Sequence, residues 1–179
     1  MQVLVTRRLT LRPPAMLDAE DIALWLSNWN VTRMLSPVPY PYARGDAEAW
    51  IASVAGKPDE LHYTIHRERL IGCVSIGLDG EIGRLGYWLG EAWHGRGFMT
   101  EAARALVAYA FETQGISRID SCVFADNPKS LRTQEKLGFT ITGTGELFSL
   151  ARGEMVPTIT TRLTAEAFAS TQSARPAAA

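Results

Sequence analysis

The chain has 179 residues, a formal net charge of −1 at pH 7, 46% hydrophobic residues and 9% aromatic residues. This length suits one ordinary domain, and the composition indicates a packed globule rather than a disordered chain. The near-zero charge gives no electrostatic reason to expect nucleic acid or an anionic membrane as a partner, and no apolar run approaches the length of a membrane span.

Cysteine and histidine usage gives no sign of a disulfide framework or a metal site. Cys73 and Cys122 both lie in apolar runs, so we expect two reduced core thiols. No metal is expected, because the three histidines show no helical ligand spacing. The N-terminus also lacks a signal-peptide core. Together these features predict a cytoplasmic protein.

The first third of the chain predicts one strand and two helices around an irregular loop. Apolar and polar residues alternate over 6–14 until two prolines end the strand, and a helix capped by Asp18 is expected through Leu26. A second short helix is expected over 46–54. The loop between the helices is either a wall of the substrate site or a cover for the edge of the core. It holds three prolines and the aromatic residues Trp29, Tyr40 and Tyr42.

The middle of the chain predicts three strands, a glycine-rich loop and a long helix. Two strands are expected over 61–66 and 70–78, and an apolar, aromatic stretch over 85–89 predicts a buried strand. Three glycines then follow within residues 90–97, where positive φ angles and close approach to another molecule become accessible. From residue 100 to 112 apolar residues recur at helical spacing.

The last third predicts a strand over 116–124, a helix from the Asp126-Asn127-Pro128 break to Leu137, and a hairpin of strands over 140–150 and 155–163. The alanine-rich residues 165–179 are weakly patterned, so we expect a tail with one helical turn at most.

A strand that runs through a glycine-rich loop into a helix leaves the first helical amides unpaired, which makes an anion site, most often for phosphate. A nucleotide-binding P-loop is excluded, because Phe98 and Met99 stand where it needs Lys and then Ser or Thr. A dinucleotide site is disfavoured: Gly95 and Gly97 give the first half of its glycine pattern, but Thr100 replaces the third glycine. The remaining interpretation is a site at which the backbone amides of the loop bind a diphosphate.

Two runs carry a resemblance to a known family. They are GYWLGEAWHGRGFMTEA over 86–102 and DNPKSLRTQEKLGF over 126–139, and TRRLTLRPP over 6–14 and LIGCVSI over 70–76 also fall in matching places. Together they resemble the GCN5-related N-acetyltransferases (GNAT), most closely the RimJ/RimL-like group that acetylates N-termini of ribosomal proteins. The resemblance covers nearly the whole chain. It implies an α/β fold with a mixed, mostly antiparallel seven-stranded sheet and about four helices, in a single domain over residues 1–164.

The same resemblance implies acetyl-CoA as cofactor and names the residues that hold it. The diphosphate clamp Gln/Arg-x-x-Gly-x-Gly/Ala falls on residues 94–99, where only Gly97 matches the pattern and where the bulk of Met99 is expected to narrow the pocket. Asn127 and Ser130 form the Asn-x-x-Ser of the group, although Asn before Pro128 is also a good helix cap. The expected cofactor-binding residues are Trp88, Leu89, His94, Gly95, Arg96, Gly97, Phe98, Met99, Thr100, Asn127 and Ser130.

For catalysis, the resemblance assigns the Ser130 hydroxyl to a hydrogen bond with the developing thiolate and a backbone amide near Leu89 to the thioester carbonyl. No general base is expected, because Arg84 and Pro157 stand where relatives often carry carboxylates. The residues expected to contact the acceptor are Trp29, Tyr40 and Arg84.

The sequence therefore predicts an N-acetyltransferase whose acceptor is a protein N-terminal α-amine. Two alternatives stay open. One is acetylation of a small amine such as an aminoglycoside or a polyamine, and the other is a non-catalytic acetyl-CoA-binding module. The expected assembly is a monomer or homodimer.

Overall fold

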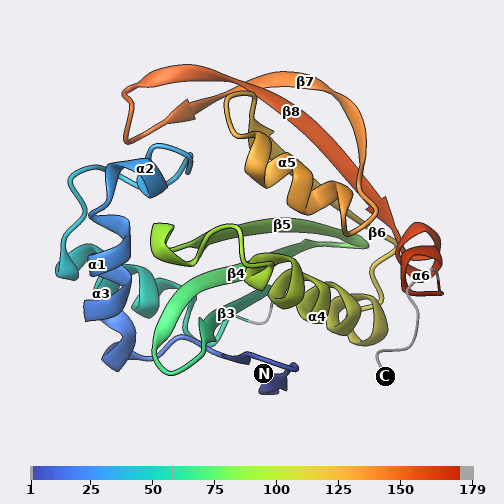
Figure 1. The fold of residues 1–179 in the computed structure, drawn as a ribbon, viewed down its shortest axis with the longest axis horizontal. Helices are drawn as coiled ribbons and strands as arrows, with labels where there is room; N and C mark the ends of the chain where they lie inside the picture. The colour runs from blue at the N-terminus through green and yellow to red at the C-terminus, as the bar shows by residue number, and fades with distance from the viewer. Residues whose placement is uncertain (1, 58, 174–179) are drawn as a thin grey trace.

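The computed structural model describes residues 2–57 and 59–173, and its core is a single mixed sheet of eight strands (Figure 1). The strands are β1 (Leu4–Val5), β2 (Thr10–Arg12), β3 (Glu60–His66), β4 (Leu70–Asp79), β5 (Ile82–Leu89), β6 (Arg118–Phe124), β7 (Thr140–Ser149) and β8 (Glu154–Thr164). The order across the sheet is β1-β2-β3-β4-β5-β6-β8-β7, and every neighbouring pair is antiparallel except β5–β6.

Six α-helices and two short 3-10 turns complete the described chain. The helices are α1 (Ala19–Leu26), α2 (Trp29–Thr32), α3 (Arg44–Val54), α4 (Phe98–Thr113), α5 (Pro128–Glu135) and α6 (Ala165–Ser173), and the 3-10 turns are η1 (Met16–Asp18) and η2 (Glu91–Trp93). None of the described helices is both long enough and apolar enough to cross a membrane.

Two hydrophobic clusters hold the helices against the two faces of the sheet. The larger cluster joins the inward residues of β3, β4 and β5 to the apolar face of α4, with Tyr63, Ile76 and Leu106 completely buried. The smaller cluster joins α1 and α3 to the opposite face of the sheet, where Leu70 and Trp88 lie. Because successive strand residues point to opposite faces, each helical layer takes alternate residues of the same strands. The buried side chains of the larger cluster hold α4 against the central strand β5.

The structure adds one strand and one helix to the expected fold. The seven-strand expectation is wrong because β1, with only two residues, is too short to show alternation, yet it pairs with β2. Residues 165–173 form a nine-residue helix rather than one turn, since Phe168 is buried in the main core beside Phe111. The rest of the expected tail, 174–179, lies outside the described residues.

Smaller differences also have local causes. Asp18 stands at the start of α1, but its carboxylate accepts from the Ala15 amide (2.9 Å) and pairs with Arg12 (2.6 Å) instead of capping that helix. The proline-rich loop begins with helix α2, which Asn28 caps by accepting from the Asn30 amide at 2.9 Å. The helix expected from residue 100 starts at Phe98.

Candidate active site

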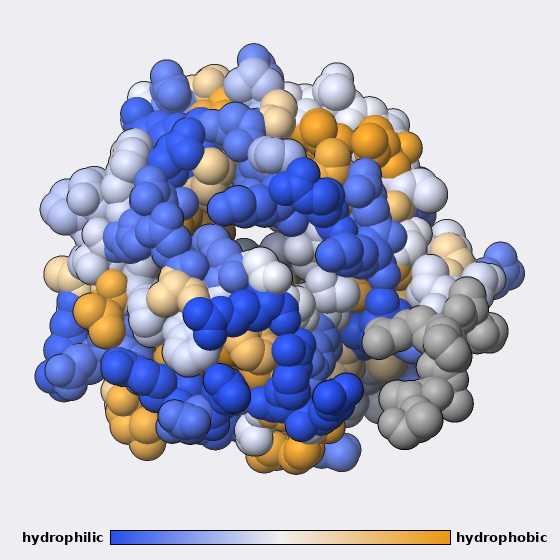
Figure 2. Space-filling model, viewed as in Figure 1, coloured by the Kyte–Doolittle hydropathy of each residue, from blue (hydrophilic) through white to orange (hydrophobic). Residues whose placement is uncertain are grey.

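The site begins where the sheet splits. Strands β5 and β6 pair only from Ile82↔Arg118 to Arg84↔Asp120, and beyond this point β5 runs on to Leu89 and β6 to Phe124 without each other. A cleft of about 1420 Å³ fills the gap, lined by the ends of both strands, the loop before α4, helix α5 and the 33–39 loop. Figure 2 shows an opening near the middle of the molecule, rimmed mainly by hydrophilic residues.

The glycine loop opens into this cleft. Gly95 (φ 75°) and Gly97 (φ 76°) have left-handed conformations that side chains rarely adopt, and Gly97 is the N-cap of α4 without any side-chain cap. A Cβ at Gly95 would meet nothing within 4 Å, and one at Gly97 would meet only Arg8 Nη2 at 3.6 Å. The first amides of α4 therefore face an open cradle that suits an anion.

Several side chains in and next to the loop are engaged with other parts of the fold. Phe98 and Met99 are 4% and 8% exposed and pack in the main core, so the bulk of Met99 is largely taken up by the core. The Nε2–H of His94 donates to the Leu89 carbonyl at 2.8 Å, and the Arg96 guanidinium lies over the Trp93 ring. The loop thus offers backbone groups rather than side chains to a ligand.

Helix α5 brings Asn127 and Ser130 to the opposite wall of the cleft. Asn127 Oδ1 accepts from the Ser130 amide at 3.1 Å, and Pro128 occupies the first helical position, so the expected cap is confirmed. The Tyr87 hydroxyl lies 2.9 Å from Ser130 Oγ and 3.1 Å from the Ser130 carbonyl oxygen. The sequence analysis missed Tyr87, although it lies within the GYWL run that signalled the family.

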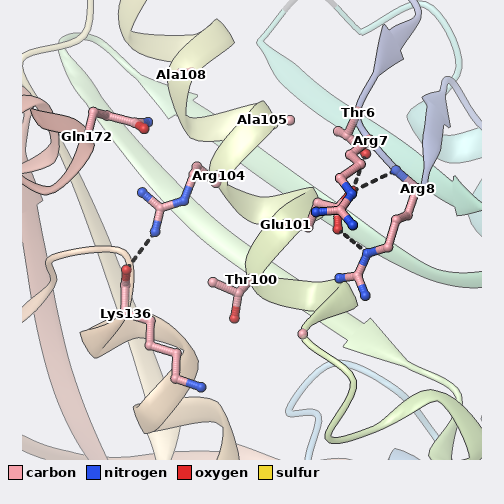
Figure 3. A pocket seen from close by; sticks show the side chains of 11 residues that line it. Thr6, Arg7, Arg8, Thr100, Glu101, Arg104, Ala105, Ala108, Lys136 and Gln172 are labelled. Carbon is pink, nitrogen blue, oxygen red and sulfur yellow. Dashed lines mark hydrogen bonds and ion pairs between the residues drawn. The ribbon is translucent and has the colours of Figure 1, made fainter. Parts of the chain in front are cut away.

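A second hollow of about 590 Å³ continues around the start of α4 and shares Gly97, Thr100 and Lys136 with the cleft (Figure 3). It is bordered by the cationic side chains of Arg7, Arg8, Arg104 and Lys136.

The carboxylate of Glu101 also lines this hollow and is fully engaged. It accepts from the Thr6 hydroxyl (2.7 Å) and from Arg8 Nε (2.6 Å), as Figure 3 shows for Arg8. Burial alone would raise its pKa, but the hydrogen bonds from Thr6 and Arg8 outweigh burial and lower it. Glu101 is therefore an ionised structural group that ties β1 and β2 to α4.

The expected acceptor residues do not line the cleft. Trp29 and Tyr40 stack edge to face with ring centroids 5.0 Å apart and are 40% and 44% exposed outside it. Arg84 points to solvent and pairs with Asp79 at 3.4 Å. Pro157 lies exposed on β8. The residues that do line the cleft include Pro37, Pro39, Tyr42, Trp50, His62, Ser75 and Cys122.

Cys122 corrects another expectation. Cys73 is buried as expected, but Cys122 is exposed and lines the cleft. The apolar run around Cys122 does carry a core face, because Ile119 and Val123 are buried. Cys122 belongs to the other face of β6, and only the arrangement of helices over the sheet decides which face is covered.

Ion pairs close the cleft on the side away from α4. Asp126 accepts from Arg33 Nη2 (2.9 Å) and from both Nη atoms of Arg152 (3.0 and 3.1 Å), and the Leu150 amide donates to the Ser36 carbonyl (3.0 Å). We call the Arg33–Asp126–Arg152 group the clasp. It joins the loop after α2, the segment before α5 and the tip of the β7–β8 hairpin, so these three segments form one wall of the cleft. No group of three or more potential metal ligands occurs among residues 2–57 and 59–173.

Comparison with known proteins identifies this arrangement. Residues 8–140, well over half of the chain, match the acetyltransferase (GNAT) domain family. An uncharacterized N-acetyltransferase, p20 of Bacillus licheniformis, is 28% identical over 165 residues, covering 87% of this chain and 92% of that protein. The [ribosomal protein uS5]-alanine N-acetyltransferase of Escherichia coli (strain K12) is 35% identical over 80 residues, covering 45% of this chain and 41% of that enzyme. The solved structure of RimL, a ribosomal L7/L12 alpha-N-protein acetyltransferase in complex with coenzyme A, superposes with a TM-score of 0.81 at 18% identity, covering 93% of this chain and 99% of that one.

Proposed function

Because this chain belongs to the GNAT family and is therefore an acetyl-CoA-dependent N-acetyltransferase, we propose that its acceptor is the α-amine of a protein N-terminus. One observation carries the proposal: the cleft between β5 and β6 joins the glycine cradle of α4 at one end and a wall without a free carboxylate base at the other. The enzyme of Escherichia coli named above acts on the alanine of a ribosomal protein, which supports the same acceptor class.

The cradle fits the diphosphate of coenzyme A. The open backbone at Gly95 and Gly97, the positive end of the α4 dipole and the nearby cations Arg8 and Lys136 all favour a polyanion. Asn127 keeps its amide NH₂ available after capping α5, and it lines the cleft. When bound, acetyl-CoA supplies the activated acetyl group.

The carboxylates that line the cleft are the reason to expect an α-amine rather than a lysine side chain as acceptor. The carboxylates among the described lining residues are Asp46, Glu91 and Asp126, and each already accepts hydrogen bonds. Hydrogen bonds from Asn28 and Asn30 lower the pKa of Glu91, and those from Arg152 lower the pKa of Asp126. A carboxylate with a lowered pKa is a poor proton acceptor near neutral pH.

Two imidazoles also line the cleft, and the Nε2–H of His94 already donates to the Leu89 carbonyl. His62 Nε2 lies 2.6 Å from Glu60 Oε2, and its Nδ1 is buried without a partner in the described structure. A buried Nδ1 has no direct path to bulk water, so we do not assign it the acceptor proton. The amine must then arrive neutral. An α-amine with a pKa near 8 is more than a hundredfold richer in the neutral form at pH 7 than a lysine side chain near 10.4.

The test compares two peptides of one sequence. The first has a free N-terminus and acetylated lysines, and the second has a blocked N-terminus and free lysine. With purified protein and acetyl-CoA, we expect faster thiol release with the first peptide, at a rate that climbs with pH to the pKa of the amine and then levels off. Faster reaction of the lysine peptide, or a strong preference for a polycationic aminoglycoside, refutes the proposed acceptor. A separate limb near pH 6–7 that disappears in His62→Gln refutes the proton pathway.

A further inference from the structure

A series of linked side-chain hydrogen bonds lies at the point where β5 and β6 separate. Ser121 Oγ lies 2.9 Å from the Leu85 carbonyl oxygen and 2.9 Å from Gln134 Nε2, and Gln134 Oε1 lies 2.6 Å from Thr161 Oγ1. Gln134 is 1% exposed and Thr161 2% exposed. These side chains supply hydrogen bonds that the strands no longer give each other beyond Arg84.

The chemistry of each group fixes the direction of this series. The Leu85 carbonyl can only accept, so the Ser121 hydroxyl donates to it. Ser121 Oγ therefore accepts from the Gln134 NH₂ group, and this orientation places the Gln134 carbonyl oxygen where it accepts from Thr161. The amide orientation of Gln134 is thus set by partners on two strands, β6 and β8.

Gln134 also interacts with the Tyr87 hydroxyl, and that hydroxyl contacts Ser130 twice. The Tyr87 hydroxyl donates to the Ser130 carbonyl oxygen at 3.1 Å, because a carbonyl can only accept, and it lies 2.9 Å from Ser130 Oγ. Tyr87 therefore holds both the backbone and the hydroxyl of Ser130, a residue that lines the cleft.

We propose that Tyr87 is a positioning residue for acetyl transfer, which holds the Ser130 hydroxyl at the cleft through its contacts with the carbonyl oxygen and Oγ of Ser130. This inference rests on the proposed acetyl transfer. It adds to that function a residue on the central strand β5.

The step balances without a proton from Tyr87 or Ser130. The lone pair of the neutral amine forms a C–N bond to the thioester carbonyl carbon, the C–S bond breaks, and its electron pair leaves on sulfur. The Ser130 O–H donates a hydrogen bond to that thiolate, and the contacts with Tyr87 keep Ser130 in place to do so. The proton lost from the amine nitrogen passes to solvent.

Burial supports the hydrogen bond from Tyr87 to the Ser130 carbonyl oxygen. Desolvation raises the pKa of Tyr87 to about 12, and the hydrogen bonds with Ser130 and Gln134 offset only part of this rise. The phenol therefore keeps its proton over the whole working range of pH.

The test is a double-mutant cycle with a matched control. In Tyr87→Phe we expect kcat to fall about tenfold, the equivalent of one lost hydrogen bond to a developing charge, with the KM for acetyl-CoA unchanged within about twofold. In Tyr87→Phe/Ser130→Ala we expect no further loss beyond Ser130→Ala, because Tyr87 acts through Ser130. The control, Tyr63→Phe, removes the hydroxyl of a buried tyrosine on β3 that donates to the Gln2 carbonyl, and should leave kcat unchanged.

The outcomes separate this inference from the proposed function. A wild-type kcat in Tyr87→Phe, or losses that multiply in the double variant, overturns the role of Tyr87 while acetyl transfer stands. A wild-type protein that releases no coenzyme A with any amine overturns the function and the inference together. Thermal unfolding of each variant shows whether a loss of kcat follows a loss of fold.

Discussion

Replacing Asn127 with alanine removes two interactions at once, and a serine replacement separates them. The Asn127 side chain caps α5 through its oxygen, which accepts from the Ser130 amide at 3.1 Å, and it offers its NH₂ group to the cleft. Loss of such a cap costs about 1 kcal/mol, which for a chain of this length lowers the unfolding midpoint by roughly 2–4 °C. Serine is an equally good cap but has no NH₂ group. Asn127→Ala should therefore lose both stability and coenzyme A affinity, and Asn127→Ser should lose affinity alone.

The assay pairs thermal unfolding with calorimetric titration of coenzyme A. One hydrogen bond from a neutral amide contributes about 1 kcal/mol, so we expect the affinity of both variants to fall about fivefold. Wild-type affinity in Asn127→Ser refutes a direct contact between the amide and the cofactor. An unchanged unfolding midpoint in Asn127→Ala refutes the cap as a stabilising interaction.

Three further predictions follow from the loop, the clasp and the thiols. Gly97→Val should abolish coenzyme A binding because it fills the cradle, whereas Gly80→Val, at another positive φ (57°) with equally open surroundings, should bind normally in the same titration. The pKa of Asp126 is lower in the folded state than in the unfolded state, where it is about 4, so the ionised carboxylate stabilises the fold above pH 4. This stabilisation is lost as the pH falls through the folded pKa. Asp126→Asn should therefore lower the unfolding free energy at pH 7 by an amount that vanishes in acid. A small alkylating reagent should modify the exposed Cys122 in the native protein and spare Cys73, whose pKa burial raises to about 12, as mass spectrometry would show.

The parts of the fold that the sequence predicted are those with a local signal. The strand–loop–helix unit from β5 to α4 was predicted because its apolar, aromatic strand residues, its glycines and its helical spacing lie within one continuous stretch. The cap at Asn127 was likewise predicted from three consecutive residues. Strand β1 and helix α6 were missed because each is stabilised by distant partners: β1 pairs with β2, and α6 is held by Phe168 in the main core.

The three residues expected to contact the acceptor do not line the cleft, because no local signal in the sequence defines its lining. Trp29 and Tyr40 are aromatic residues in a proline-rich loop, which made them candidates, but their rings pack against each other outside the cleft. Arg84 was chosen for its place on the central strand, yet it points to solvent beside Asp79. Which face of a strand lines the cleft depends on the helices that cover the other face. This cannot be predicted from the identity of single residues.

The two halves of the site therefore differ in how they are encoded. The proposed diphosphate cradle consists of backbone conformations within one segment, so we expect it to require glycine at Gly97 and to tolerate His94, which donates to the Leu89 carbonyl, and Met99, which is 8% exposed. The wall that we propose to face the acceptor is assembled from three distant segments that meet at the Arg33–Asp126–Arg152 clasp. Substitutions in the 33–39 loop or at the tip of the β7–β8 hairpin can reshape the acceptor wall without touching the cradle. Changes of acceptor within this fold are thus expected to arise around the clasp, while the cofactor and the chemistry stay the same.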